Sequence, residues 1–511
     1  MHVFLVNVAD QDYCRLLPER LNRHGGDPGR IKVMGFPPLG IETLASVVRQ
    51  RGHRVSMFDT CHPQMQGSHI AAAAQQQRPD VFALSFLSVT TYGPVKALAE
   101  TLKAAAPGVP VIIGGPFATM NSDRIIEDCP HIDGACVGEG EEFLPDYLEH
   151  LDDQAPVLGL TWRYRGRAIR NRPRPLIDNL DGYPYPDRST LPIDYIQSLP
   201  VDVPAVMSLD KFCTMQTSRG CPYSCIYCDI PELGAHKWRS RSPEHVLGEM
   251  QQLSDQGYRS VYLTDDHFLI NRGRISAICR GMVQRKLKFR WGCEGRVDSA
   301  AVDQLPAMKQ AGCDSLCFGV ESGSQKTLDR LKKHQTLRQI RDAVSAAKKH
   351  GIRWLHGFFV IGCPDETAAE IRQSFRFAAE LQLDTLSFNR LQVYRGTPLW
   401  REYVQRGIID DQADWDKWFK CCEIDPTAVP RDEVNRLRMR GYAVLFAKRL
   451  LYRPLRTSRL LRSFSRHMGA WDMLKLLYTP FRKRQFTRRP DLPTGMLAVV
   501  AGTNMADCQM S

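Results

Sequence analysis

Three cysteines lie close together in the segment TSRGCPYSCIYCDI, which covers residues 217–230. Cys221, Cys225 and Cys228 have the spacing C-x3-C-x2-C. Three thiolates do not close a tetrahedral zinc site, and the nearest histidine, His236, is eight residues further on. Thiolates are also the ligands of iron–sulfur clusters, and three of them leave one iron of a [4Fe–4S] cluster open. We therefore expect an open cluster site, with zinc or unrelated core thiols as the alternatives.

The composition is that of an ordinary water-soluble protein. The chain has 511 residues, which is enough for two or three domains. Of these residues, 43% are hydrophobic and 24% are charged. We expect no signal peptide, because the first ten residues have no basic start and no long apolar run. No stretch reaches the roughly 18 apolar residues that span a bilayer. The sixteen cysteines are scattered, so we expect reduced thiols in a cytoplasmic protein.

Positive charge is concentrated near the C-terminus. Residues 431–490 contain seventeen lysines and arginines and three acidic residues, whereas the formal net charge of the whole chain is +12. Basic helices that also carry leucine, tyrosine and phenylalanine suit an anionic membrane surface or a lipid-like substrate. A solvated helix face is the simpler alternative. We keep a peripheral membrane contact as a hypothesis and do not expect nucleic acid as a partner.

The first 150 residues alternate between apolar strands and amphipathic helices. Because this alternation is typical of a parallel, doubly wound sheet, we expect a ligand site at the carboxyl ends of the strands. The predicted strands cover 2–8, 54–59, 80–88, 109–116 and 134–141, and the predicted helices cover 40–52 and 95–105. The polar loops at the strand ends are Asp59-Thr60, Ser85 to Thr91, Gly114 to Pro116 and Gly138 to Glu141.

A proline-rich connector is predicted over 151–205, followed by a second alternating array over 206–400 and a basic helical region over 401–511. Six strand–helix units predict a partial (β/α)6 barrel rather than a closed eight-stranded one. The cysteine motif follows the first strand, at the end where such barrels carry their chemistry. The predicted strands cover 212–218, 260–266, 288–296, 315–322, 354–362 and 385–394, and helices are predicted over 243–257, 337–351, 431–452 and 460–478.

With Tyr227 before its last cysteine, the motif resembles that of the radical S-adenosylmethionine superfamily. The segments YLTDDHF, FGVESGSQKTLDRLKK, GFFVIGCPDET and YRGTPL follow it in order. The resemblance implies a [4Fe–4S] cluster on the three cysteines, with S-adenosylmethionine on the open iron. One electron from a donor such as flavodoxin or ferredoxin would then release a 5'-deoxyadenosyl radical. The protein would contribute positioning and the exclusion of water.

The N-terminal segments resemble the cobalamin-binding class of this superfamily. They are FPPLGIETLASVVRQRGHRVSMFD, LSFLSVTTYGPVKALAE, VIIGGPFAT and CVGEGEEFLPDYL, and the resemblance covers about residues 1–400. It implies a Rossmann-like cobalamin domain before the radical domain. The pattern D-x-H-x-x-G is absent, and Asp12 lies where its histidine would fall, so we expect no histidine on cobalt. Phe117 and Arg395 replace a histidine and a proline of the family patterns.

The resemblance also suggests which barrel residues bind S-adenosylmethionine. Asp265 and Asp266 end the second strand, where the family contacts the methionine amino group, and backbone capping is the alternative. Arg296 is expected to pair with a carboxylate of cofactor or substrate, or else to form a surface ion pair. Histidines such as His267 and His356 are more often core or surface residues than catalytic ones, and His267 is kept as a catalytic candidate because it follows the aspartates. The full set of expected residues is Tyr227, Asp265, Asp266, Arg296, Glu321, Ser322 and Gly362.

The polar loops of the first domain supply the expected cobalamin contacts. Glycines there would let the backbone approach a nucleotide tail, although a tight turn alone also explains them. Hydroxyls there would hydrogen-bond the tail or cap a helix. The expected residues are Ser85, Ser88, Thr90, Gly114, Gly115, Gly138, Glu139 and Gly140.

The resemblance implies methyl transfer from cobalamin to an unactivated carbon of a small molecule. One S-adenosylmethionine would remethylate cobalamin, and a second would provide the radical. The alternatives are a non-methylating reaction such as oxidative cyclisation of a tetrapyrrole, a radical modification of RNA, and cofactor binding without catalysis. The RNA enzymes carry cluster cysteines in their first domain, and Cys14, Cys61, Cys129 and Cys136 lack that spacing. We expect a lipid-like or tetrapyrrole substrate and predict no individual catalytic residue.

Overall fold

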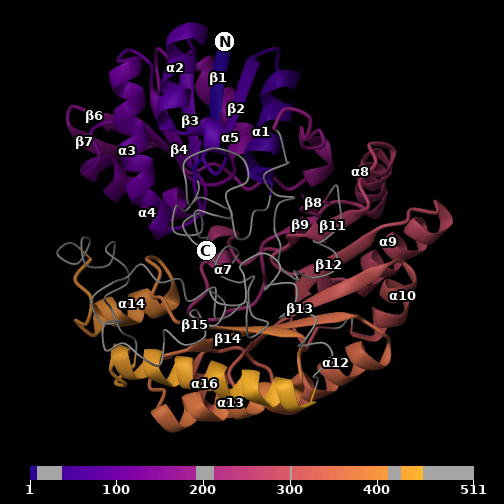
Figure 1. The fold of residues 1–511 in the computed structure, drawn as a ribbon. Coiled ribbons are helices and arrows are strands. Elements are labelled where there is room, and N and C mark those ends of the chain that lie inside the picture. The colour runs from indigo at the N-terminus through magenta and orange to yellow at the C-terminus, as the bar shows by residue number, and fades with distance from the viewer. Residues whose placement is uncertain (9–36, 192–211, 300–301, 412–426, 453–511) are drawn as a thin grey trace. The chain divides into compact units, whose positions relative to one another are not determined.

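The computed structural model describes residues 1–8, 37–191, 212–299, 302–411 and 427–452. The chain divides into two units, Met1–Ile196 and Gln197–Met510 (Figure 1). The predicted helix over 460–478 and the position of Asp12 lie outside the described residues.

Seven strands form the sheet of the first unit, in the order β2-β1-β3-β4-β5-β6-β7. The first five are parallel, and β6 and β7 continue the sheet antiparallel. All five predicted strands are confirmed, and the hairpin β6–β7 lies in the segment for which we predicted only a connector. The bounds are β1 (His2–Asn7), β2 (Arg54–Asp59), β3 (Val81–Ser85), β4 (Val111–Gly114), β5 (Gly134–Cys136), β6 (Leu160–Tyr164) and β7 (Arg167–Arg170).

Helices cover both faces of this sheet, as expected for a doubly wound fold. On one face, Leu5 of β1 shares a core with Ala45 of α1 and Tyr147 of α5. Neighbouring side chains of a strand point to opposite faces, so Phe4 of β1 lies on the other face from Leu5. There its ring meets that of Phe82 of β3 edge to face. The helices are α1 (Leu39–Gln50), α2 (Gly67–Gln77), α3 (Val89–Ala105), α4 (Pro116–Asp128) and α5 (Gly140–Glu149), with short 3-10 turns η3 (Pro63–Met65) and η4 (Leu180–Gly182).

Helix α3 begins earlier than predicted. We expected a loop from Ser85 to Thr91, but the helix starts at Val89 with Ser88 as its N-cap residue. The Thr91 hydroxyl accepts a hydrogen bond from the Ser88 backbone nitrogen (3.4 Å) and donates one to its carbonyl oxygen (2.7 Å). This local capping closes the first helical turn before the apolar pattern begins.

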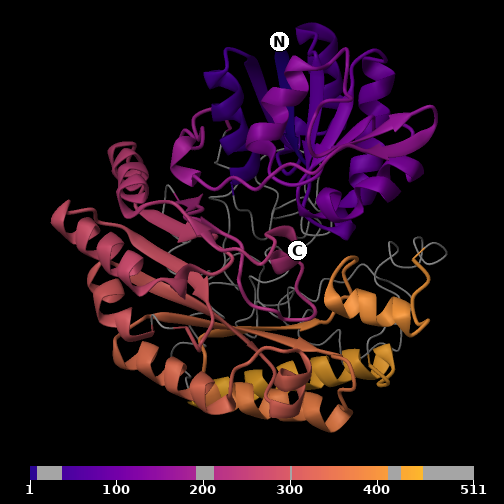
Figure 2. The ribbon, with the colours of Figure 1, turned by 180° about the vertical axis from the view of Figure 1, so that it is seen from behind.

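The second unit contains a six-stranded parallel sheet in the order β15-β14-β13-β12-β11-β8. All six predicted strands are confirmed, and the two described helices predicted between them are α8 and α12. Figure 2 shows the curved sheet from behind, with helices along its outer side. The strands are β8 (Phe212–Met215), β11 (Ser260–Leu263), β12 (Arg290–Gly295), β13 (Cys313–Glu321), β14 (Trp354–Ile361) and β15 (Thr385–Arg390).

The helices of the second unit follow the strands in sequence. They are α8 (Pro243–Asp255), α9 (Arg272–Gln284), α10 (Leu305–Gln310), α11 (Gln325–Arg330), α12 (Leu337–Lys349), α13 (Ala368–Leu381), α14 (Pro398–Gln405) and α16 (Arg431–Tyr452), with turns η5 (Phe268–Ile270) and η6 (Val302–Gln304). Helix α16 packs on α13. Its Tyr442 hydroxyl accepts a hydrogen bond from the backbone nitrogen of Phe388 at 2.7 Å, which ties this helix to the sheet.

The cysteines of the described residues are free thiols. Among the described helices, none is long and apolar enough to cross a bilayer.

Candidate cluster and cofactor site

A small antiparallel ladder closes the loop that carries the three cysteines. Strand β9 (Ser218–Arg219) enters the loop, helix α7 (Ile230–Leu233) follows the last cysteine, and β10 (Arg239–Ser240) pairs back onto β9. Gly220, directly before Cys221, has a φ of +82°, and a Cβ atom there would lie 2.1 Å from the carbonyl oxygen of Lys237. The loop therefore requires glycine at this position, both for its backbone conformation and for space.

Both aspartates at the end of β11 hold the entry to this loop. The Asp265 carboxylate accepts hydrogen bonds from the Thr217 nitrogen and hydroxyl, each at 2.6 Å, and from the Ser218 hydroxyl at 2.5 Å. Asp266 accepts one from the nitrogen of Gly220 at 2.6 Å. The pair thus acts as a backbone cap for the cysteine loop. Its contact with the methionine amino group stays a prediction.

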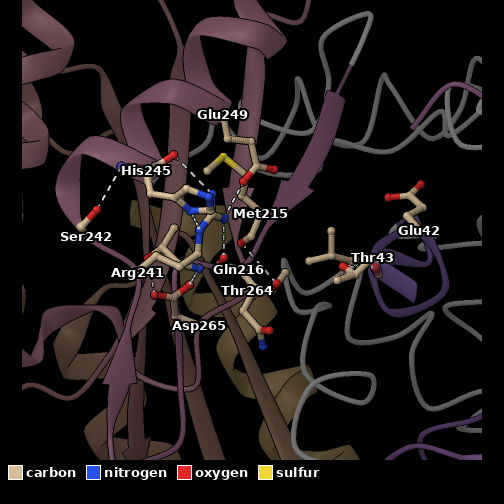
Figure 3. A network of polar contacts seen from close by, with 12 residues as sticks. Glu42, Thr43, Met215, Gln216, Arg241, Ser242, His245, Glu249, Thr264 and Asp265 are labelled. Carbon is tan, nitrogen blue, oxygen red and sulfur yellow. Dashed lines mark hydrogen bonds and ion pairs between the residues drawn. The ribbon is translucent and has the colours of Figure 1, made fainter. Parts of the chain in front are cut away.

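Two buried arginines support the same junction. Arg241 donates to the carbonyl oxygen of Gln216 at 2.9 Å and pairs with Glu249 at 2.5 Å (Figure 3). Arg274 donates to the carbonyl oxygens of Thr217 at 2.7 Å and Arg241 at 2.9 Å. A guanidinium has five N–H donors in a rigid plane, so it can hold several carbonyls at once.

The three cysteines of the motif differ in their exposure to solvent. Cys225 is buried, and Cys221 and Cys228 are partly exposed. Burial raises the pKa of the Cys221 and Cys228 thiols, so metal binding has to displace their protons. In the described parts of the chain, no three ligand-type side chains converge on one point as a single ion requires. A cubane cluster differs, because each thiolate binds its own iron.

Arg296 lies against the cysteine loop. Its Nη1 atom is 3.6 Å from the sulfur of Cys225, and its guanidinium lies 3.9 Å from the centre of the Tyr223 ring. Asp298 is its ion-pair partner at 2.7 Å. Arg296 is thus buried beside Cys225, an expected cluster ligand, rather than in a surface ion pair. Its pairing with a cofactor or substrate carboxylate stays a prediction.

Glu321 ends β13 in the left-handed region, with a φ of +63°. One carboxylate oxygen pairs with the Lys333 ammonium at 2.7 Å, and burial together with the charge of Glu321 raises the pKa of the Tyr227 phenol. The other oxygen is buried without a partner among the described residues. A buried, unpaired acceptor beside the cysteine loop fits a polar ligand such as the hydroxyl or ammonium groups of S-adenosylmethionine.

The remaining barrel candidates have partners of their own. The Ser322 hydroxyl lies 3.1 Å from that of Ser374 and accepts a hydrogen bond from the Ser324 nitrogen at 3.1 Å. Gly362 has a φ of +77°, and its nitrogen donates to the Glu366 carboxylate at 2.6 Å. Ser322 therefore joins β13 to α13, and Glu366 shapes the turn after β14.

Among the glycines at the carboxyl edge of the first sheet, two are explained by packing. A Cβ atom on Gly115 would lie 2.3 Å from the Phe86 carbonyl oxygen, and one on Gly140 would lie 3.0 Å from Leu44. Gly114 would tolerate one, with Cys136 at 3.7 Å. Gly138 differs, because its φ is +104° and nothing lies within 4 Å of the missing Cβ. Such an open cradle fits close approach of a bulky ligand.

Most of the polar candidate residues at the same edge of the sheet already form hydrogen bonds within the protein. The hydroxyls of Ser88 and Thr90 lie 2.8 Å apart in the first turn of α3. Glu139 accepts a hydrogen bond from the nitrogen of Ile177 at 2.7 Å, which fixes the chain after β7. Ser85 is the last residue of β3. The edge is the one expected for a ligand site, and each residue's contact with cobalamin stays a prediction.

Sequence reasoning missed Tyr223, Arg241, Arg274 and Lys333. Tyr223 lies between two of the cysteines, so its place in the motif was a usable signal. Lys333 is part of the quoted segment FGVESGSQKTLDRLKK. Its ion pair with Glu321, however, depends on the turn that follows α11. The two arginines carry no local signal, because their partners lie on other elements.

Two family models match the chain. The B12 binding domain matches residues 34–148, and the radical SAM superfamily model matches residues 215–378. An uncharacterised methyltransferase of Pyrococcus horikoshii is 31% identical over 81% of this chain and 88% of its own length. An anaerobic magnesium-protoporphyrin IX monomethyl ester cyclase of Cereibacter sphaeroides is 24% identical over 84% of this chain and 70% of its own.

A shorter match and a solved structure add to this. The hopanoid C-2 methylase of Rhodopseudomonas palustris is 29% identical over 39% of this chain and 40% of its own length. The radical S-adenosylmethionine methyltransferase TsrM from Kitasatospora setae superposes with a TM-score of 0.66, at 17% identity, over 79% of this chain and 76% of its own. At this identity the superposition supports the fold.

The fold and the three-cysteine loop define a radical S-adenosylmethionine enzyme with a cobalamin-binding domain. The chain belongs to the cobalamin-dependent radical S-adenosylmethionine methyltransferase family, which also includes cyclases. Its cofactors are a [4Fe–4S] cluster, S-adenosylmethionine and cobalamin, as the sequence predicted. The thiol donors, the unpaired Glu321 oxygen and the open side of Gly138 fit these groups.

Proposed function

We propose that this protein transfers a methyl group to an unactivated carbon of a small molecule. The observation that carries the proposal is the similarity to a protein named as a methyltransferase along 81% of the chain, through both cofactor-binding domains. When bound, the cluster with S-adenosylmethionine supplies a carbon-centred radical, and cobalamin supplies the methyl group.

The protein's own residues position these groups. Cys221, Cys225 and Cys228 hold the cluster on a loop whose base is tied down by Asp265 and Asp266. The closed ladder of β9 and β10 keeps the loop from opening. Because catalysis here depends on placing a reactive group near one carbon, this rigidity is the protein's main contribution.

A lipid-like or tetrapyrrole substrate is proposed from the names of two relatives, a hopanoid methylase and a porphyrin-ester cyclase. The exposed side of α16 adds support for a contact with anionic membrane surfaces, because Arg436, Arg440, Val444 and Lys448 recur at helical spacing on it. An external one-electron donor of the flavodoxin or ferredoxin type completes the proposed partners.

Oxidative ring closure on a tetrapyrrole is the second candidate, favoured by the similarity to the cyclase over 84% of this chain. The two reactions differ in products. Methylation consumes S-adenosylmethionine as a methyl donor and releases S-adenosylhomocysteine, whereas ring closure does not.

The test uses the anaerobic protein with reconstituted cluster and cobalamin, reductant and S-adenosylmethionine, with extracted lipids or porphyrin esters as candidate substrates. Mass spectrometry should find S-adenosylhomocysteine, 5'-deoxyadenosine and a product heavier by one methylene unit. The Cys225→Ala variant, which lacks one cluster ligand, should form no 5'-deoxyadenosine. Ring-closed product without S-adenosylhomocysteine would replace methyl transfer by cyclisation.

A further inference from the structure

His267 is a buried histidine beside the cysteine loop, and none of the contacts described above explains why a histidine is there. The residue is 1% exposed, and neither of its ring nitrogens has a hydrogen-bond partner among the described residues. It stacks on Tyr223, with the ring centres 5.7 Å apart and the planes at 27°. Tyr223 lies between Cys221 and Cys225, so the imidazole packs directly on the segment that joins the first two cluster ligands.

The surroundings of His267 favour an anionic or electron-rich partner. Burial, together with the nearby charges of Arg296 and Lys333, lowers its pKa to about 3. The imidazole is therefore neutral and offers one N–H donor. Arg296 reaches the sulfur of Cys225, and Lys333 pairs with Glu321. Asp298 pairs with Arg296 and Glu321 pairs with Lys333, so it is the unused imidazole N–H, and not a net positive charge, that favours an acceptor beside the cysteine loop.

His356 of β14 provides an internal comparison. It is also fully buried, and burial likewise lowers its pKa to about 3. Both of its ring nitrogens have partners, however, with the Thr385 hydroxyl at 2.8 Å and the Ser387 hydroxyl at 3.4 Å. Buried polar atoms are normally paired, so an unpaired histidine in the same barrel requires an explanation.

We propose that His267 is a positioning residue whose ring N–H donates a hydrogen bond to an acceptor that arrives with the cofactors. The acceptor is a sulfur of the cluster or the carboxylate oxygen of S-adenosylmethionine on its open iron. Hydrogen bonds to cluster sulfurs stabilise the more negative, reduced state and raise the reduction potential. The proposal rests on the cofactors of the family and not on methyl transfer, so the two can fail separately.

The test compares His267→Phe, which keeps an aromatic ring for Tyr223, with His356→Phe. In the cluster-free protein, H267F should leave the thermal midpoint unchanged or raised, because it removes two unpaired polar atoms. H356F should lower that midpoint, because it removes the two buried hydrogen bonds of His356 with the Thr385 and Ser387 hydroxyls. After reconstitution, iron content is measured first, followed by an electron paramagnetic resonance redox titration without S-adenosylmethionine and by equilibrium dialysis with it.

A more negative midpoint potential of H267F without S-adenosylmethionine would assign the acceptor to the cluster. An unchanged potential with S-adenosylmethionine binding weakened about 5- to 30-fold would assign it to the carboxylate. His267→Asn, which keeps an N–H donor, should partly restore whichever property changed, and H356F should change neither. The proposal is overturned if H267F alters neither property, or if it destabilises the cluster-free protein as H356F does.

Discussion

Asp265 accepts hydrogen bonds from both the backbone nitrogen and the hydroxyl of Thr217, each at 2.6 Å. This pair joins the end of β11 to the segment that leaves β8, four residues before Cys221. The cluster loop is therefore held from the neighbouring strand and not only by its own ladder. Two neighbouring parallel strands, β8 and β11, therefore both contribute to the position of the loop.

We expect Asp265→Asn to loosen the cluster loop. The amide keeps one acceptor oxygen but loses the charge and part of the triple contact, which should cost about 1.5–3 kcal/mol in the free energy of unfolding. Urea denaturation and iron content after reconstitution measure the two effects. Asp303→Asn, in an exposed ion pair with Arg272, is the matched control and should change stability by under about 1 kcal/mol. Full iron content in D265N would contradict the anchoring role.

The ion pair of Lys333 and Glu321 should behave as a unit. Both side chains are buried, so Lys333→Met leaves an uncompensated carboxylate and should cost about 3–5 kcal/mol of stability in the cluster-free protein. Adding Glu321→Gln removes that charge and should recover much of the loss. Chemical denaturation of the two single variants and the double variant gives the coupling free energy. Additive effects would show that the two residues act independently.

Glu366 should make stability depend on pH. Burial raises its pKa from 4.5 to about 7, although its carboxylate accepts hydrogen bonds from the nitrogens of Gly362 and Cys363. Between those values the folded state keeps a proton that the unfolded state releases, so stability falls as pH rises. The loss should be on the order of 1–3 kcal/mol.

Glu366→Gln cannot titrate and should flatten that dependence while keeping an acceptor for the two nitrogens. The measurement is the free energy of unfolding of the cluster-free protein at intervals from about pH 4.5 to pH 7.5. Equal slopes in the wild type and in E366Q would refute the assignment to this residue.

Gly138→Ala should weaken cobalamin binding, and Gly52→Ala should not. Both glycines have positive φ, at +104° and +83°, and both have open space where a Cβ would go. Each substitution should therefore cost about 1–2 kcal/mol through backbone strain. Gly52 precedes β2 at the opposite edge of the sheet from Gly138. The measurement is the amount of cobalamin that each variant retains after gel filtration, determined by absorbance. Equal retention in the two variants would exclude Gly138 from the binding site.

Several features were readable from the sequence because they depend on local patterns. The apolar periodicity predicted all five parallel strands of the first unit and all six of the second. The order of the short motifs predicted both cofactor classes, as the family models confirm. The C-x3-C-x2-C motif supplied the expected cluster ligands, and that assignment stays a prediction. The hairpin β6–β7 was missed because its strands are short and its outer residues polar, a pattern that resembles a loop.

Other features were decided only by the tertiary structure. Gly115 and Gly138 look alike in sequence, but Phe86 crowds one and nothing crowds the other. Asp265 and Asp266 were expected at the cofactor, and their hydrogen bonds go to the cysteine loop. His267 and His356 are both buried, but only His356 receives hydrogen-bond partners from neighbouring elements in the described structure. The local sequence determines which residues lie at the end of a strand. The hydrogen-bond partner of a buried polar group comes from a distant segment, and the position of that partner depends on the packing of the whole barrel.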